Sequence, residues 1–261
     1  MSNSTMYRPP YSGSQQDWLF RVAKGQVPGH KTFGAFGERD NVAIVATGAD
    51  VWRGVLPKLP HPASGGVQMT VTSSDDDDTL IGPGVEKVQI NYLDGSGQEQ
   101  EEIVNMNGST GRNTIATDIT WVNSMHSVQG ADAVALGNIT IHAVGVPVTV
   151  YNMIEAGGNM SLTCAVKVPT GKTLYIVQWY ATQAGNKPTT LRLRSTDRDG
   201  TLYPDIFLFK ESFYLDQAPL SDWIAPQLLI PADSIVKVSA WAAGAGGNVS
   251  AGFRGILVDD E

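Results

Sequence analysis

The chain has 261 residues, of which 18 are lysine or arginine and 26 are aspartate or glutamate, so its formal net charge is −8. At roughly 150 residues per domain, this length fits two modest domains or one large all-β domain with an additional segment. The acidic balance argues against nucleic acid as the main partner, because phosphate-backbone binding needs clustered positive charge. The single cysteine, Cys164, excludes an intrachain disulfide framework. No segment approaches the ~18 apolar residues of a membrane span, so we expect no membrane partner.

Residues 1–62 have the composition of an extended N-terminal arm, because prolines and glycines interrupt them and no hydrophobic period is sustained. Within the arm, the run Ser14-Gln15-Gln16-Asp17 resembles a capping box and precedes apolar residues that share one helical face. It predicts a short helix ending at Gly25. Large aromatic side chains are unfavourable in a solvated tail, so we expect those of the arm to bind a partner protein. These partner-binding candidates are Tyr7, Tyr11, Trp18, Phe33, Phe36 and Trp52. The alternative is that Phe33 to Trp52 cover the core of the first domain.

A first β domain is expected at residues 63–147. Alternation of apolar and polar side chains predicts strands at 67–71, 88–92 and 138–144. Asp94-Gly95 and Asn107-Gly108 each predict a hairpin, because both central positions of a type I′ turn need positive φ. Residues 118–125 fit either a strand or a turn of helix.

A second β domain is expected at residues 148–261. The alternation is regular here, and the segment 174–180 is apolar on both faces, as in a central strand. The predicted strands are 162–168, 174–180, 191–194, 236–240 and 249–257. The sequence therefore predicts an all-β protein with two β-sandwich or jelly-roll-like domains preceded by an extended N-terminal arm.

Few residues have the spacing of a catalytic or metal site. The histidines are His30, His61, His126 and His142, and none lies in an HExxH or CxxC pattern. Cys164 falls on the apolar face of a predicted strand, which favours a buried, unreactive thiol over a nucleophile. We therefore predict no catalytic residue, no metal and no cofactor, and do not expect an enzyme.

The acidic run Asp75-Asp76-Asp77-Asp78 has two interpretations. Hard cations such as Ca²⁺ bind several carboxylate oxygens, but the run lacks the spacing of an EF-hand loop. Four adjacent carboxylates also repel one another, so we favour a hydrated loop.

Aromatic residues of the second half could alternatively stack on sugar rings, as in a carbohydrate-binding module. The residues in question are Trp179, Trp223 and Trp241 with Tyr175, Tyr203 and Tyr214. Aromatic residues in strands are more often part of the core, so this interpretation ranks behind an assembly function.

Short motifs rich in turn residues run from residue 27 to residue 172 and so cover most of the chain. They are Val27-Pro28-Gly29-His30, Phe36-Gly37, Val51-Trp52, Ser73-Ser74, Asp78-Thr79, Gly82 and Gly84, Tyr92-Leu93-Asp94-Gly95, Glu101, Asn107-Gly108, Gly137-Asn138-Ile139-Thr140 and Val168-Pro169-Thr170-Gly171-Lys172. This set resembles the virion structural proteins of tailed bacteriophages. The resemblance implies a β-rich accessory subunit without catalytic residues.

Together, the resemblance and the aromatic arm predict a capsid decoration or cement subunit. An arm that becomes ordered on a neighbour buries apolar area, so residues 1–62 are expected to bind the major capsid protein. Copies joined on a symmetric lattice gain avidity, which favours a homotrimer. Two alternatives stay open: a tail or fibre accessory protein that contacts the host surface, and the carbohydrate-binding module.

Overall fold

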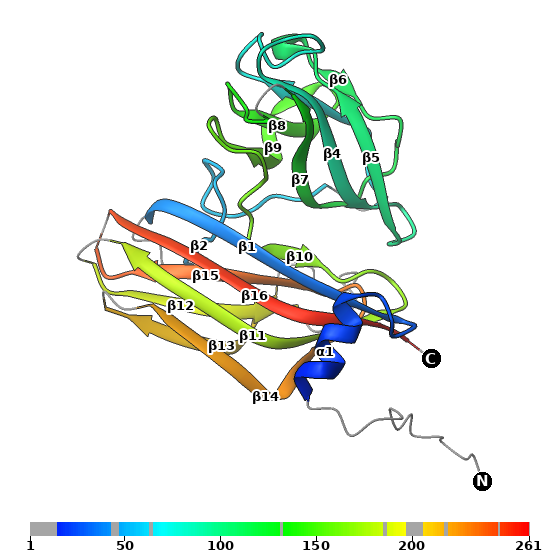
Figure 1. Cartoon of the computed structure of the whole chain (residues 1–261). Coiled ribbons are helices and arrows are strands. Elements are labelled where there is room, and N and C mark those ends of the chain that lie inside the picture. The colour runs from blue at the N-terminus through cyan, green and yellow to red at the C-terminus, as the bar shows by residue number, and fades with distance from the viewer. Residues whose placement is uncertain are drawn as a thin grey trace.

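The computed structural model describes residues 15–260 except 43–46, 63–64, 131–132, 185–186, 197–205, 217–218 and 245. For 15–17 and 223–226 it describes the backbone only. Tyr7 and Tyr11 lie outside the described residues. Within them, almost all regular structure is antiparallel β-sheet, arranged in two packed bodies (Figure 1). The predicted all-β fold class is confirmed.

The strand pairing divides the described chain into a large and a small sandwich. The elements are α1 (Gln15–Ala23), β1 (His30–Val42), β2 (Ala49–Asp50), β3 (Met69–Ser73), β4 (Val85–Leu93), β5 (Glu99–Asn105), the 3-10 helix η1 (Gly108–Thr110), β6 (Arg112–Asn113), β7 (Trp121–Gly130), β8 (Ile139–Ala143), β9 (Val146–Ile154), β10 (Ala165–Lys167), β11 (Lys172–Ala184), β12 (Thr189–Ser195), β13 (Leu208–Leu215), β14 (Leu220–Ile230), β15 (Ile235–Ala242) and β16 (Gly247–Asp259). The large sandwich comprises α1, β1, β2 and β10–β16, and the small sandwich comprises β3–β9. The small sandwich is therefore an insertion between β2 and β10.

The large sandwich packs the sheet β1-β16-β11-β14 against the sheet β10-β15-β12-β13, with β2 paired to β15. Its core contains alternate side chains of both sheets, including the fully buried Trp179 and Leu191. The strand predicted to be central, 174–180, lies within β11 between β16 and β14, as its apolar character indicated.

The small sandwich packs the sheet β6-β3-β8-β9 against the sheet β5-β4-β7. The predicted alternation is confirmed in β3, β4 and β8, where Val71, Ile90 and Ile139 are buried in one core. Residues 118–125, which the sequence left open, contain the start of β7.

Helix α1 confirms the predicted short helix. It ends at Ala23, and Gly25 follows with φ +67°, the left-handed conformation that terminates a helix at little steric cost. Its apolar face packs on the outer surface of β16: Val22 of the helix and Val27 of the segment that follows it cluster with Ile256.

The prediction of an extended arm over 1–62 is wrong for residues 30–42. This segment is β1, an edge strand of the large sandwich that pairs along its length with the antiparallel strand β16. The side chains of Phe33 and Ala35 pack against the core, and Phe36 lies on the opposite face. The strand was missed because three glycines or alanines and several charged residues dilute its two-residue period.

The predicted domain boundary near residue 147 also needs correction. Strand β9 begins at Val146 and pairs with β8, with Ile154 opposite Ile139, so the small sandwich extends past the boundary. The chain enters the large sandwich only after an isolated bridge between Met160 and His126. Val148 on β9 is almost fully exposed, so this strand lacks the regular alternation of buried and exposed side chains from which strands are predicted.

The two glycine turns differ from the predicted type I′ geometry. Between β4 and β5, positive φ occurs at Gly97 and not at Gly95, and the Asp94 carboxylate accepts hydrogen bonds from the backbone N–H groups of Ser96 and Gln98. The hairpin itself is confirmed. Gly108 has positive φ but begins η1, so Asn107-Gly108 does not close a hairpin.

Gly37 marks a close approach between the two sheets of the large sandwich. A Cβ atom on this residue would overlap the backbone nitrogen of Cys164 and lie 2.5 Å from the carbonyl oxygen of Val51. We expect Gly37→Ala to lower the free energy of unfolding by about 2–3 kcal/mol, because the clash is with backbone that cannot move aside. Urea unfolding measures the effect. Gly247→Ala, where the added methyl group meets ordinary van der Waals contacts, is the matched control; equal losses in both variants would contradict this account.

The two sandwiches meet through a separate apolar cluster and a turn-to-turn contact. The cluster consists of Trp52, Leu59, Leu93, Trp121, Ala165 and Ile235. Beside it, the Thr170 N–H donates a hydrogen bond of 2.9 Å to the carbonyl oxygen of Gly97, which joins the β4–β5 hairpin tip to the large sandwich. Three members of this cluster, Leu59, Trp121 and Ile235, also line a cavity beside the junction.

Candidate functional site

Two of the predicted partner-binding residues lie at the surface of the large sandwich. Trp18 on α1 packs edge-to-face on His30, with ring centroids 5.7 Å apart. Phe36 stacks on Tyr180 with a centroid distance of 6.4 Å. Both rings are half-buried against their own chain, which leaves part of each available to a partner.

Two other candidates belong to the protein's own core, which corrects their assignment as surface anchors. Trp52 is 1% exposed, and its indole N–H donates a 3.0 Å hydrogen bond to the carbonyl oxygen of Leu56. Phe33 packs against the core of the large sandwich. The alternative, that this segment covers the core of the first domain, differs in location: Phe33 packs on the core of the large sandwich, and Trp52 lies in the cluster between the two sandwiches.

The acidic run is a surface loop in which one carboxylate has a different environment. Asp78 is fully buried, and its two oxygens accept hydrogen bonds from the Ser73 hydroxyl and from the N–H groups of Val85, Leu136 and Gly137, at 2.6 to 3.1 Å. Asp76 and Asp77 are exposed. The predicted hydrated loop therefore describes these two residues, whereas Asp78 anchors the loop to the small sandwich.

The chemistry-bearing residues singled out from sequence are dispersed. Cys164 is fully buried, as predicted, and burial raises the pKa of its thiol well above the ordinary value. His142 is buried in β8, whereas His126 is half-buried in β7. Within the described ranges, no group of three or more His, Cys, Asp or Glu side chains lies close enough to hold a metal ion.

The aromatic residues considered for sugar stacking also lie in different parts of the structure. Trp179 is fully buried and stacks on Phe213 at a centroid distance of 3.7 Å, so it offers no surface to a sugar. Trp241 is half-buried and lines a cavity. The Trp223 side chain and Tyr203 lie outside the described residues.

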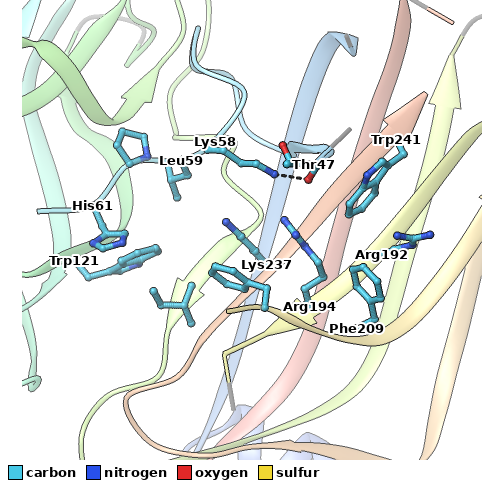
Figure 2. A pocket seen from close by; sticks show the side chains of 13 residues that line it. Thr47, Lys58, Leu59, His61, Trp121, Arg192, Arg194, Phe209, Lys237 and Trp241 are labelled. Carbon is cyan, nitrogen blue, oxygen red and sulfur yellow. Dashed lines mark hydrogen bonds between the residues drawn. The ribbon is translucent and has the colours of Figure 1, made fainter. Parts of the chain in front are cut away.

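A cavity of about 680 Å³ opens where the segment after β2 and the small sandwich meet strands β12, β13 and β15 (Figure 2). Four cationic side chains line it: Lys58, Arg192, Arg194 and Lys237. Aromatic side chains line it as well: His61, Trp121, Phe207, Phe209 and Trp241. The cavity combines positive charge with flat apolar surfaces in a protein whose net charge is negative.

A single buried carboxylate, Asp50, organises the cations at the base of this cavity. Asp50 is 1% exposed; Lys237 Nζ lies 2.8 Å from one of its oxygens, and Arg194 Nη2 lies 3.1 Å from the other. The Ser239 hydroxyl and the Leu59 N–H also donate to it. Burial alone would raise the pKa of Asp50, but the charge of Lys237 and these hydrogen bonds outweigh it and hold the pKa below the ordinary value.

Lys58 and Arg39 add positive charge around the same carboxylate. Lys58 Nζ lies 4.0 Å from Asp50 and donates a hydrogen bond of 2.6 Å to the carbonyl oxygen of Thr47. The pKa of Lys58 is lowered to about 8, mainly by burial; the positive charges of Arg194, Lys237 and Arg39 act in the same direction, and the attraction of Asp50 opposes them. Arg39 donates hydrogen bonds to backbone carbonyl oxygens of the β2 segment, including that of Leu56 at 3.0 Å.

Sequence reasoning missed this site because its members come from five strands, β2, β7, β12, β13 and β15, and from the segment after β2. The one available signal was the Arg192–Arg194 alternation on a strand, which places two guanidinium groups on one face. Asp50 gave no signal, because nothing local indicates that β2 pairs with β15, about 190 residues later in the chain.

A second surface feature is the exposed apolar edge formed by β13 and β14, each the last strand of its sheet (Figure 1). We call it the β13–β14 edge. Its exposed apolar side chains are Ile206, Leu208, Phe209, Tyr214, Leu220 and Leu229. Adjacent unpaired strand edges with apolar side chains are typical of surfaces that pair with another chain.

The fold and these two surfaces define an all-β protein of two sandwiches with a cationic cavity beside their junction. No protein-family model and no curated protein sequence matches the chain. Among solved structures, a chain from "Structure of infectious bursal disease virus Gt strain" aligns with 89% of this chain and 74% of its own length, at 10% identity and a TM-score of 0.25. A chain from the corresponding Gx strain structure aligns with 88% and 77%, at 12% identity and a TM-score of 0.21. Such low scores define no shared fold.

No helix among the described residues has the length and apolar character to span a membrane. The described helix α1 has nine residues and packs on the large sandwich.

Proposed function

We propose that this chain is a non-catalytic structural subunit of a bacteriophage virion, and specifically a decoration or cement protein of the capsid that assembles as a homotrimer. The observation that carries the proposal is the β13–β14 edge, where five large apolar side chains are exposed on the two terminal strands and a sixth, Ile206, is exposed just before β13. Burying such a surface against another copy stabilises an assembly by roughly 25 cal/mol per Å² of apolar area. The motifs that resemble tailed-phage virion proteins support the same assignment.

The structure changes which part of the chain is available to bind the capsid. Strand β1 and Trp52 belong to the large sandwich, so residues 30–62 cannot act as a free arm without unfolding it. The capsid-binding role is therefore proposed for residues 1–14, which contain Tyr7 and Tyr11, together with the exposed part of Trp18 on α1. The β13–β14 edge is proposed as the contact between copies of the chain.

The test separates assembly from particle binding. In solution, light scattering after size-exclusion chromatography is expected to give the mass of a trimer, and the Tyr214→Lys/Leu229→Lys variant is expected to give a monomer. Ser212→Lys/Gln227→Lys adds the same charge at exposed polar positions of the same edge and is expected to stay trimeric.

Quantitative mass spectrometry of purified particles then measures incorporation. We expect many copies per shell, and a loss of roughly tenfold or more when residues 2–14 are deleted while the trimer persists. A copy number of a few per particle would assign the protein to the tail instead. A wild-type monomer that is absent from particles would overturn the proposal.

A further inference from the structure

The cavity beside the junction of the two sandwiches is rich in hydrogen-bond donors and poor in acceptors. None of its described lining residues is an aspartate or glutamate, and four of them carry a lysine or arginine charge. Asp50 lies behind this lining and is already bonded to Arg194, Lys237 and Ser239. Among the described residues of this region, the four lysine and arginine charges therefore outnumber the single carboxylate of Asp50.

Aromatic rings also contact two of these cations. The Arg192 guanidinium lies over Phe209 at 4.4 Å and over Trp241 at 4.6 Å from the ring centroids. Lys237 lies 4.0 Å over Phe207. A guanidinium stacked on a ring keeps its in-plane N–H groups free to bind an oxyanion in bidentate geometry. Within the described part of the chain, Arg192 makes no hydrogen bond or ion pair.

Two buried N–H donors of the lining residues also lack acceptors. The Nε atom of Arg194, a residue that is 8% exposed, has no hydrogen-bond partner among the described residues, and neither does Nε1 of Trp121. Buried polar atoms in folded proteins are almost always paired with protein, water or ligand. An acceptor oxygen in the cavity would pair with these two N–H groups and would be attracted by the surrounding positive charges.

We propose that this cavity binds the phosphate or sulfate group of a small molecule, with Arg192 and Lys58 contacting the oxyanion from the open side and Arg194 and Lys237 supporting it from the base. The roughly tetrahedral group fills a small part of the 680 Å³ volume, so the remaining space beside Trp121 and Phe209 accommodates an apolar or planar body (Figure 2). The proposal does not rest on the assembly function proposed above, although Phe209 belongs both to the cavity lining and to the β13–β14 edge.

Isothermal titration calorimetry of the full chain tests the site with three probes: inorganic phosphate, sulfate and phenyl phosphate, each against sodium acetate at equal ionic strength. We expect phenyl phosphate to bind at least about tenfold more tightly than acetate. Its phosphate group accepts more charge-assisted hydrogen bonds than a carboxylate does, and its ring enters the cavity. Inorganic phosphate binding as tightly as phenyl phosphate would identify the free anion as the ligand, and tighter binding of phenyl phosphate an organic ester.

Variants locate the binding. Arg192→Gln is expected to weaken phenyl phosphate binding by about tenfold or more, and Arg192→Lys to weaken it less, since charge remains but the planar fork is lost. Lys24→Gln removes the same charge at the end of α1, away from the cavity, and is expected to have no effect. Lys58→Gln provides a second, more exposed position should Arg192→Gln lower the yield of folded protein.

The pH dependence gives a further signature. The groups facing Lys58 are Asp50, Arg39, Arg194 and Lys237, and only Lys58 is expected to titrate between about pH 7 and pH 9.5. Loss of its proton removes one positive charge, so phenyl phosphate affinity is expected to fall as pH rises through about 8. The decline is expected to disappear in Lys58→Gln.

Two results would overturn the proposal. The first is binding of all probes no tighter than acetate at equal ionic strength. The second is an equal response of Arg192→Gln and Lys24→Gln.

Discussion

Replacing Asp50 by alanine is expected to lower the free energy of unfolding by about 3–5 kcal/mol, which for most single domains is a large fraction of the total. The carboxylate is 1% exposed and lies within 3.1 Å of both Arg194 Nη2 and Lys237 Nζ. Without it, the two buried cations lose the carboxylate that they share, and removal of a buried counter-charge costs more than the intact pair contributes. Equilibrium unfolding in urea measures the loss.

The control for this variant is Asp222→Ala, which removes an exposed carboxylate from β14 in the same sandwich and is expected to change stability by less than about 0.5 kcal/mol. Asp50→Asn keeps the shape and removes the charge, so it separates the electrostatic contribution from packing. A loss of under 1 kcal/mol in Asp50→Ala would show that the cations reach water or another carboxylate, and that Asp50 does not organise the site.

Acid is expected to destabilise the wild-type protein through the same residue. The pKa of Asp50 is lower in the folded than in the unfolded protein, where it is about 3.9. The stabilisation is therefore complete above about pH 4 and is lost as pH falls through the folded value, when the carboxylate accepts a proton and no longer balances the cations. Comparison of urea midpoints for wild type and Asp50→Asn down to pH 3 is expected to show the difference between them shrinking.

Replacing Asp78 by alanine is expected to lower the free energy of unfolding of the small sandwich by about 3 kcal/mol or more. Its carboxylate accepts four hydrogen bonds, from the Ser73 hydroxyl and from the N–H groups of Val85, Leu136 and Gly137. Truncation leaves these donors buried without an acceptor and removes the link between the end of β3 and the approach to β8. Thermal and urea unfolding with a probe in the small sandwich measure the effect.

Asp77→Ala is the matched control, because the neighbouring side chain is exposed and belongs to the same acidic run. We expect this variant to be near neutral, or slightly stabilising through relief of repulsion between adjacent carboxylates. Similar losses in both variants would instead support a role for the whole run, such as shared binding of a cation.

Local pattern was sufficient for a large part of the fold. The two-residue period located β3, β4, β8, β11, β12, β15 and β16, and the capping run located α1. These elements were predictable because one side of each strand faces a core, so burial imposes alternation on the sequence itself. The same reasoning placed Cys164 in the core.

The sequence by itself determined the all-β class, most of the strands and the acidic, cysteine-poor character of the chain. Only the tertiary structure decided that 30–42 form an edge strand against β16 and that the small sandwich is inserted between β2 and β10. It also decided that Asp50 pairs with Arg194 and Lys237, which lie 144 and 187 residues later in the chain. The reason is physical: burial leaves a periodic trace in a single segment, whereas strand partners and charge clusters depend on contacts between distant segments, which no local period records.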